Sequence, residues 1–341
     1  MRRILKVTAL FFFFSSFFLF IYQPAVSAEE LAAGFTVEGV PNERQIDKNL
    51  SYFYLKEEPG QTDEIKILLT NNSSEDKTLI VNVVDANTNS NGLVDYTGNL
   101  KNHATLETPL SSIVSEVKRE VLVPKNGEIE ITLELKMPLE SFEGVVVGGV
   151  VVSEKLEDDQ TADSLMFKNT YSYTIAIVLT NEANTEIKKR VSVELEKVEP
   201  ILYDGRKIVQ VTILNPNSYI FHDASVSGSI FEKSTNKKVI ESKKDGISIA
   251  PHSVYPFMFD WQKKKLEPGT YIFRGQVTAE KDKWDFEKEF TITEEQSNEI
   301  NEKTVFKVTI PTWLELSGTI ALVTAILTTI LAIIRKQRKK G

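Results

Sequence analysis

The chain contains no cysteine among its 341 residues. This absence excludes disulfides, thiolate metal sites and cysteine nucleophiles. A secreted animal protein made of small β domains normally carries disulfides, so the composition favours an exported bacterial protein whose stability rests on its hydrophobic core. Histidine is almost as scarce, and His103, His222 and His252 occur in none of the spacings typical of metal ligands. We therefore expect no metal and no cofactor.

Catalytic signatures are also missing. The sequence has no G-x-S-x-G elbow, no Walker loop and no dinucleotide-binding glycine pattern. A glycosidase needs two carboxylates facing each other across a cleft, whereas the Asp158–Asp159 pair lies in a polar stretch that reads as solvated. We expect no catalytic residues and no enzyme, with a cell-wall glycosidase as an alternative.

Positive charge is scarce outside the two ends of the chain. The whole chain carries −8, of which residues 1–28 contribute +3 and the last seven residues +5, so the part between them carries about −16. Such an acidic surface disfavours nucleic acid as a partner, because phosphate backbones repel it.

Only two long hydrophobic runs occur. The first follows Arg2, Arg3 and Lys6 and ends in the small residues Ala25–Ala28, a pattern typical of a secretory signal peptide over residues 1–28.

The second apolar run covers residues 313–334, which is long enough to cross a membrane as a helix. The basic residues of the tail 335–341 predict that the C-terminus is cytoplasmic and the N-terminus extracellular. We expect a single-pass protein of the cell membrane. The candidate anchor and interface residues are Trp313, Arg335, Lys336 and Arg338.

About 285 residues lie between the two runs, enough for two domains. Alternating or β-branched segments predict strands near 35–40, 51–55, 64–69, 78–84, 117–123, 128–137 and 145–152, then near 171–179, 191–198, 207–214, 224–231, 255–259, 270–279 and 284–293. About seven short strands per half is typical of an immunoglobulin-like β-sandwich, although a barrel fits the same pattern. The predicted fold is all-β, with two such sandwiches in tandem.

The predicted domain boundaries follow changes in composition. The acidic stretch before Ser164 separates the halves, and Gly148–Gly149 marks a bulge or a close backbone approach in a core strand. The strand near 171–179 is assigned to the second sandwich, with donation back to the first left open. The predicted parts are a signal peptide (1–28), a first sandwich (29–154), a linker (155–164), a second sandwich (165–295), a stalk (296–312), a transmembrane helix (313–334) and a tail (335–341).

One loop has the composition of a binding surface. Residues 87–92 are rich in asparagine, and amides pair with both glycan hydroxyls and peptide groups. A plain solvated loop fits the same residues. The candidate partner or glycan contacts are Asn87, Asn89, Asn91, Tyr96 and Tyr52.

An ordered series of short motifs runs through both halves of the chain. In the first half they are Phe35-Thr-Val, Asn42 to Gln45, Tyr52-Phe53-x-Leu55, Pro59-Gly60-Gln61, Asn87-Thr88-Asn89, Met137-Pro138 and Gly148-Gly149. In the second half they are Tyr171-x-Tyr173, Asn215-x-Asn217, Ala250-Pro251-His252-Ser253, Pro268-Gly269-x-Tyr271 and Trp284-x-Phe286. The two series resemble the DUF916 and DUF3324 domains, respectively, of the WxL-interacting proteins of low-GC Gram-positive bacteria. His252 departs from the family pattern, which has asparagine there.

The resemblance implies a non-catalytic, membrane-anchored adaptor at the cell surface. Its implied partners are a secreted WxL-domain protein and peptidoglycan, the latter through the first domain. Binding of host extracellular matrix protein is associated with the second domain, so an adhesin that contacts the host directly is the alternative.

Overall fold

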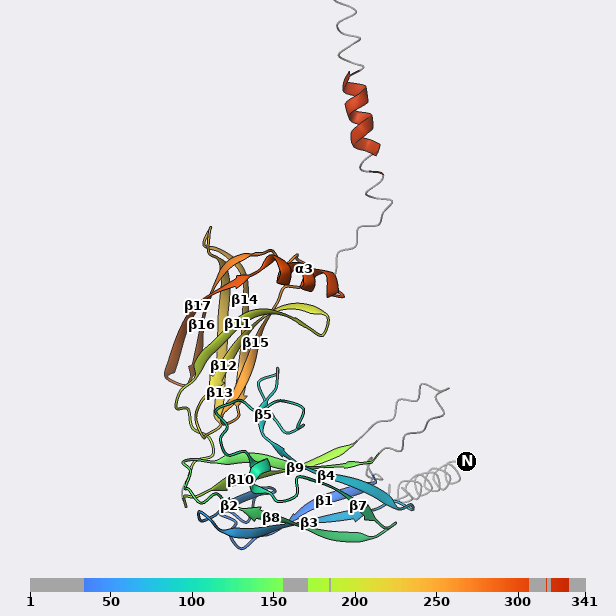
Figure 1. Ribbon diagram of the computed structural model, residues 1–341, viewed down its shortest axis with the longest axis vertical. Helices are drawn as coiled ribbons and strands as arrows, with labels where there is room; N and C mark the ends of the chain where they lie inside the picture. The colour runs from blue at the N-terminus through green and yellow to red at the C-terminus, as the bar shows by residue number, and fades with distance from the viewer. Residues whose placement is uncertain (1–33, 156–170, 184, 307–316, 318–319, 331–341) are drawn as a thin grey trace, which may run out of the picture.

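The computed structural model describes residues 34–155, 171–183, 185–306, 317 and 320–330 (Figure 1). The chain is predominantly β and forms several sheets. The predicted signal peptide and basic tail, with Arg335, Lys336 and Arg338, lie outside the described residues, as do Trp313 and most of the predicted linker.

Two sheets make up the first half of the chain. One has the strand order β1-β3-β8 and the other β2-β10-β9-β4-β7. The strands are β1 (Phe35–Val40), β2 (Phe53–Lys56), β3 (Thr62–Asn71), β4 (Lys77–Asp85), β7 (Lys118–Val123), β8 (Glu128–Lys136), β9 (Val146–Glu154) and β10 (Ser172–Thr180), with the short pair β5 (Asn87–Thr88) and β6 (Val94–Asp95) and the helical turn α2 (Leu110–Ile113). Neighbours are antiparallel except β2 and β10, which run parallel.

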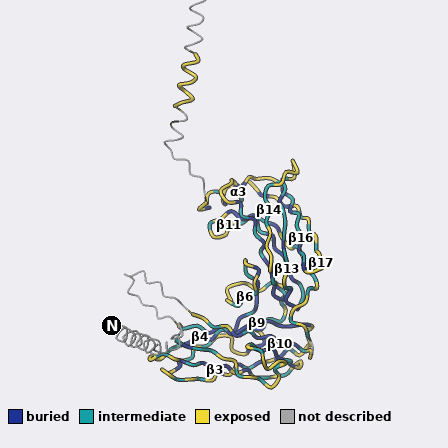
Figure 2. The backbone as a smooth tube through the Cα atoms, turned by 180° about the vertical axis from the view of Figure 1, so that it is seen from behind, coloured by how far each residue is buried: buried dark blue, intermediate teal, exposed yellow. Residues whose placement is uncertain are grey.

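The alternation of apolar and polar residues explains how these sheets pack. In β8, Ile131, Leu133 and Leu135 are buried. Thr132, which lies between two of them, and Glu128, at the start of the strand, are exposed. The inward side chains of both sheets form one core, to which α2 contributes the buried Leu110 and Ile113. Figure 2 shows buried residues along the strands of this half, including β9 and β10.

The second half has a core of its own between two further sheets. Their orders are β11-β12-β15 and β14-β13-β16-β17. The elements are β11 (Glu194–Tyr203), β12 (Arg206–Asn215), β13 (Phe221–Glu232), β14 (Lys237–Ile249), β15 (Ser253–Asp260), β16 (Gly269–Ala279), β17 (Asp282–Ile292) and the helix α3 (Glu294–Lys303). Buried aromatic rings fill this core, among them Phe257 and Phe259, whose centroids are 5.0 Å apart.

The second half stands over the five-stranded sheet of the first (Figures 1 and 2). Thr88 of β5 fastens the two, since its Oγ1 accepts the Ala250 N–H at 2.9 Å and lies 3.1 Å from Ser253 Oγ. Gly144 has a positive φ of 75°, and a Cβ there would lie 2.4 Å from the Ser218 carbonyl oxygen. Close backbone approach therefore joins the halves.

Two predicted boundaries need correction. β10, assigned to the second sandwich, pairs with β9 and β2 of the first half, because its inward residues Ile175, Ile177 and Leu179 belong to that core. The predicted stalk begins inside α3, which packs onto the second half through the buried Ile300 and is capped by Thr293. Residues 307–312 of the stalk lie outside the described residues.

Among the residues with a described position, no helix combines the length and apolar character needed to cross a membrane. The predicted span over 313–334 is only partly described: residues 320–330 are helical and exposed.

Candidate functional site

The asparagine-rich loop lies between the two halves. Asn87 is buried and its Nδ2 donates to Asn102 Oδ1 at 2.9 Å. Asn89 Oδ1 accepts the backbone N–H groups of Asn91 (2.9 Å) and Leu93 (3.2 Å) and so shapes its own turn.

The tip of this loop docks on the second half. The Gly92 carbonyl accepts the Ser248 N–H at 2.8 Å, and a Cβ on Gly92 would lie 3.0 Å from Ile247. Most polar groups of the loop thus serve internal contacts, and Asn91 is the asparagine that remains exposed. A partner contact at Asn87, Asn89 or Asn91 stays a prediction.

Tyr52 and Tyr96 come together at a different place, a hollow of about 620 Å³ that we call the tyrosine hollow. Tyr52 and Tyr54 project from the same face of the chain because they are two residues apart, and Phe53 between them enters the core. Tyr96 lies over Gly149, where a Cβ would be 3.3 Å from its ring. The remaining lining residues are Val147, Ala176, Val178, Thr185, Glu186, Ile187, Lys188 and Ile220.

The far wall of the tyrosine hollow belongs to the segment that leads into the second half. Lys188 and Ile220 form an isolated parallel β-bridge, and the Ile220 N–H donates to the Ile187 carbonyl at 2.9 Å. The Tyr54 hydroxyl donates to the Thr185 carbonyl. The hollow therefore depends on both halves, which is why sequence reasoning on one loop missed Tyr54 and residues 185–188. The two-residue spacing of Tyr52 and Tyr54 was the available signal.

Burial raises the pKa of all three tyrosines above the ordinary value. Burial first, and then the neighbouring Tyr52, raises the pKa of Tyr96 to about 12. Burial is also the main reason that the pKa values of Tyr52 and Tyr54 are raised. All three phenols are therefore neutral donors at physiological pH. The tyrosine hollow thus combines the apolar faces of the rings with neutral hydroxyls, and Glu186 and Lys188 lie at its rim. This combination suits a ligand that has both apolar faces and hydroxyl or amide groups, such as a saccharide.

A buried carboxyl lies elsewhere in the first half. Glu57 is fully buried, and no donor among the described residues gives a hydrogen bond to either carboxyl oxygen. Burial, followed by a hydrogen bond to the adjacent Asp63 and the charge of Asp63, raises the pKa of Glu57 to about 8. The Arg44 guanidinium, whose Nε is 3.7 Å from Glu57 Oε2, has the opposite effect on this pKa. No motif or pattern in the sequence distinguishes this glutamate from the other acidic residues.

The histidines have local partners. His103 Nε2 lies 3.1 Å from Glu196 Oε1, and His252 Nε2 lies 3.0 Å from Ser218 Oγ. His252 has a φ of 49°, a left-handed conformation that asparagine adopts more easily. Within the described part of the chain, no group of three or more His, Asp or Glu side chains is placed to hold a metal ion.

Solved structures similar to the chain include chaperones of bacterial fimbriae. The class 5 fimbriae chaperone CfaA is 14% identical, covering 75% of this chain and 98% of that one, with a TM-score of 0.25. A chaperone–tip adhesin complex of CFA/I fimbriae biogenesis is 11% identical, covering 69% and 92%, with a TM-score of 0.27. The CupB2 chaperone of Pseudomonas aeruginosa is 13% identical, covering 66% and 91%, with a TM-score of 0.22. TM-scores this low do not establish a shared fold.

No curated protein matches the sequence. Two family models do: the peptidoglycan binding domain of WxL Interacting Protein over residues 35–154, and the host binding domain of the same family over residues 162–302. Both are binding domains, and together they account for most of the chain. With both domains in succession, the chain belongs to the WxL-interacting protein family.

Proposed function

We propose that the chain is a non-catalytic adaptor, anchored in the cell membrane, that binds peptidoglycan and recruits a secreted WxL-domain protein to the cell surface. The names of the two matched domains support a surface binder, and the family name supports the WxL partner. Each half is proposed to be an immunoglobulin-like sandwich, since two sheets enclose one core in each.

The tyrosine hollow is the observation that carries the peptidoglycan part of the proposal. Its three rings all lie within the matched peptidoglycan binding domain, and they offer a face on which a sugar ring can stack. Glu186 and Lys188 provide polar groups for the amides and charges of peptide stems.

A non-catalytic role is consistent with the placement of Glu57. A glycosidase acid with a raised pKa must reach its substrate, whereas the Glu57 side chain is 0% exposed. The glycosidase alternative receives no support from this carboxyl.

The first test measures binding of the full chain to purified peptidoglycan. Replacing Tyr96 by alanine removes the ring over Gly149, and we expect affinity to fall about tenfold, the equivalent of ~1.4 kcal/mol. Tyr96→Phe keeps the ring and is expected to bind nearly normally. Tyr171→Ala, an exposed tyrosine outside the hollow, is the matched control. Equal affinity of the Tyr96→Ala and Tyr171→Ala chains would contradict the assignment of the hollow.

A second arm separates the adaptor from the adhesin alternative, which the name of the host binding domain favours. The immobilised full chain is offered a WxL-domain protein and, separately, host matrix proteins. Micromolar binding of the WxL protein supports the adaptor. Binding of matrix protein alone supports the adhesin.

The proposed anchor rests on residues 313–334 and the basic tail. The described helical part, residues 320–330, exposes large apolar side chains such as Ile320, Ile326 and Ile330. A chain ending after residue 306 is expected in the culture medium, and the full chain in the membrane fraction. Recovery of both from the same fraction would remove the anchor from the proposal.

A further inference from the structure

The five-stranded sheet ends in an edge that is only partly covered. β10 has nine residues, and the four residues of β2 pair with it only from Ile177 to Thr180. No described strand pairs with the same side of Ser172–Ala176. The backbone N–H and C=O groups that point to that side therefore have no strand partner.

This uncovered edge lacks the features that usually guard edge strands. Natural proteins protect them with charges, proline or bulges, because a bare edge pairs with other chains. Residues Ser172–Ala176 are Ser, Tyr, Thr, Ile and Ala, and their register with β9 is continuous. The edge strand β14 is different, with four lysines and shifted register against β13. An unguarded edge indicates a surface that a partner covers.

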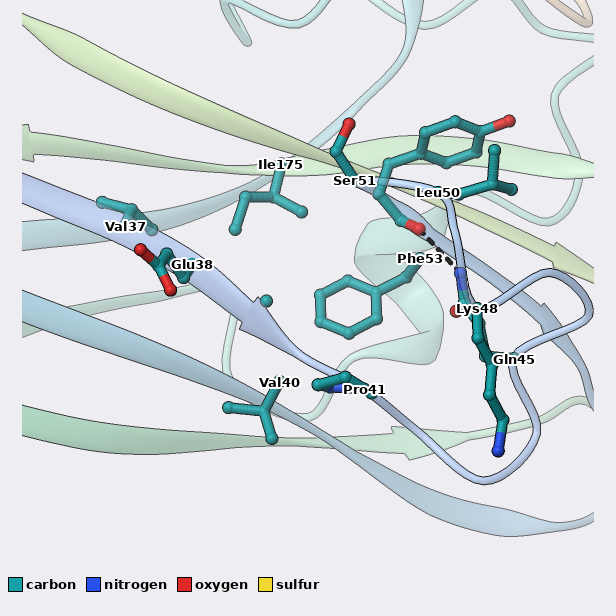
Figure 3. Close-up of a pocket in the computed structure, with 12 residues that line it drawn as sticks. Val37, Glu38, Val40, Pro41, Gln45, Lys48, Leu50, Ser51, Phe53 and Ile175 are labelled. Atoms are coloured by element: carbon teal, nitrogen blue, oxygen red, sulfur yellow. Dashed lines mark hydrogen bonds between the residues drawn. The ribbon is translucent and has the colours of Figure 1, made fainter.

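A hollow lined by both apolar and polar residues opens beside this edge. It measures about 310 Å³ and lies between β1, the loop 45–51 and Ile175 of β10. Figure 3 shows side chains of β1, of this loop and of β10 around the Phe53 ring. Its apolar lining residues are Val37, Val40, Leu50, Phe53 and Ile175, and its charged ones, Glu38 and Lys48, are of opposite sign.

The opposite face of the same edge borders the tyrosine hollow. Ala176 lines the tyrosine hollow, and Tyr52 lines both hollows. Successive side chains of a strand point to opposite faces of its sheet. A strand placed beside Ser172–Ala176 would therefore direct every second side chain toward the hollow around Phe53 and the remaining ones toward the tyrosine hollow.

We propose that Ser172–Ala176 is a docking edge for an extended, uncharged segment of another polypeptide, which adds to the sheet in line with β2. Only a polypeptide repeats donors and acceptors at the spacing of a strand, and five residues span ~17 Å. The apolar side chains that line the hollow favour apolar side chains at alternate positions of the segment. Its two charged residues, Glu38 and Lys48, are of opposite sign and so favour neither an acidic nor a basic segment. The inference deepens the proposed function by giving the surface for a protein partner, and it does not depend on peptidoglycan binding.

The test uses the full chain and a short end-blocked peptide in which valine and threonine alternate. We expect the peptide to slow hydrogen exchange at backbone amides within Ser172–Ala176 by about tenfold at saturation, without slowing exchange in β14. Thr174→Lys, an exposed position on this edge, is expected to weaken peptide binding about tenfold. Thr132→Lys makes the same change at an exposed position of β8, one of the two edge strands of the other sheet, and is expected to bind normally.

Three results would overturn the inference. One is unchanged exchange at Ser172–Ala176 in saturating peptide. Another is equal binding by the Thr174→Lys and Thr132→Lys chains, or equal binding of a peptide with N-methylated backbone amides, which keeps the side chains but lacks the donors. The third is a dimer of the free chain that Thr174→Lys dissociates, because a second copy would then be the occupant. Loss of peptidoglycan binding in Tyr96→Ala tests the proposed function separately.

Discussion

At the scale of single residues, Glu57 makes stability depend on pH in an unusual direction. The folded chain keeps its proton up to a pKa of about 8, whereas an unfolded glutamate loses it near 4.5. Between pH 4.5 and pH 8 the folded chain therefore holds a proton on Glu57 that the unfolded chain has lost. The contribution of this proton to the free energy of unfolding is fully present below pH 4.5 and is lost as the pH rises toward 8. Glu57→Gln stays neutral, and we expect it to be more stable than the parent at pH 8.5, by roughly 3 kcal/mol, but similar at pH 5.

Hydrogen exchange of β2 and β10 amides at both pH values measures this difference, since Glu57 follows β2 directly and its N–H donates to the Thr180 carbonyl at 2.9 Å. Glu130→Gln is the control, because Glu130 is exposed, pairs with Lys66 at 3.1 Å and is not among the groups that shift the pKa of Glu57. Parallel pH profiles for parent and Glu57→Gln chains would show that the carboxyl is not the source.

At the scale of elements, the paired glycines of β9 have unequal roles. A Cβ on Gly148 would lie 2.4 Å from the Val84 carbonyl oxygen and 2.5 Å from Leu110, whereas on Gly149 its nearest contact is 3.1 Å. Gly148→Ala must displace β4 or α2, and we expect it to lower the free energy of unfolding by about 2 kcal/mol. Gly149→Ala should cost clearly less. Urea unfolding of the two chains checks the order, and a larger loss for Gly149→Ala would contradict it.

The same elements show how far pattern reasoning reaches. Gly148–Gly149 was predicted to be a bulge or a close approach, and the unbroken register of β9 with the contacts of Gly148 shows the close approach. The strand β14 is absent from the predicted strands because its many charges hide any alternation, and Gly246, with a φ of 70°, lies inside it. Segments with one buried face are readable, whereas an exposed edge strand depends on the neighbour it pairs with.

At the scale of the whole molecule, the candidate site could be predicted only in part. Tyr52 and Tyr96 were selected by composition, but Thr185 and Ile187 reach the tyrosine hollow because the chain crosses there into the second half. Likewise, the composition of the asparagine-rich loop does not predict that Gly92 contacts β14 or that Thr88 contacts the start of β15. Contacts between distant segments depend on how two folded units meet, and local periodicity does not encode that.

The contact at Thr88 predicts how the two halves cooperate. Thr88→Val keeps the shape of the side chain but removes the oxygen that accepts the Ala250 N–H, leaving a buried donor unpaired at a cost of about 1–3 kcal/mol. Because this donor lies between the halves, the loss should weaken their coupling more than either core. We expect calorimetry of the Thr88→Val chain to show two separated unfolding transitions where the parent shows closer or merged ones. Thr132→Val, on the exposed edge strand β8 far from the junction, serves as the control, and an identical separation in both variants would show that Thr88 does not couple the halves.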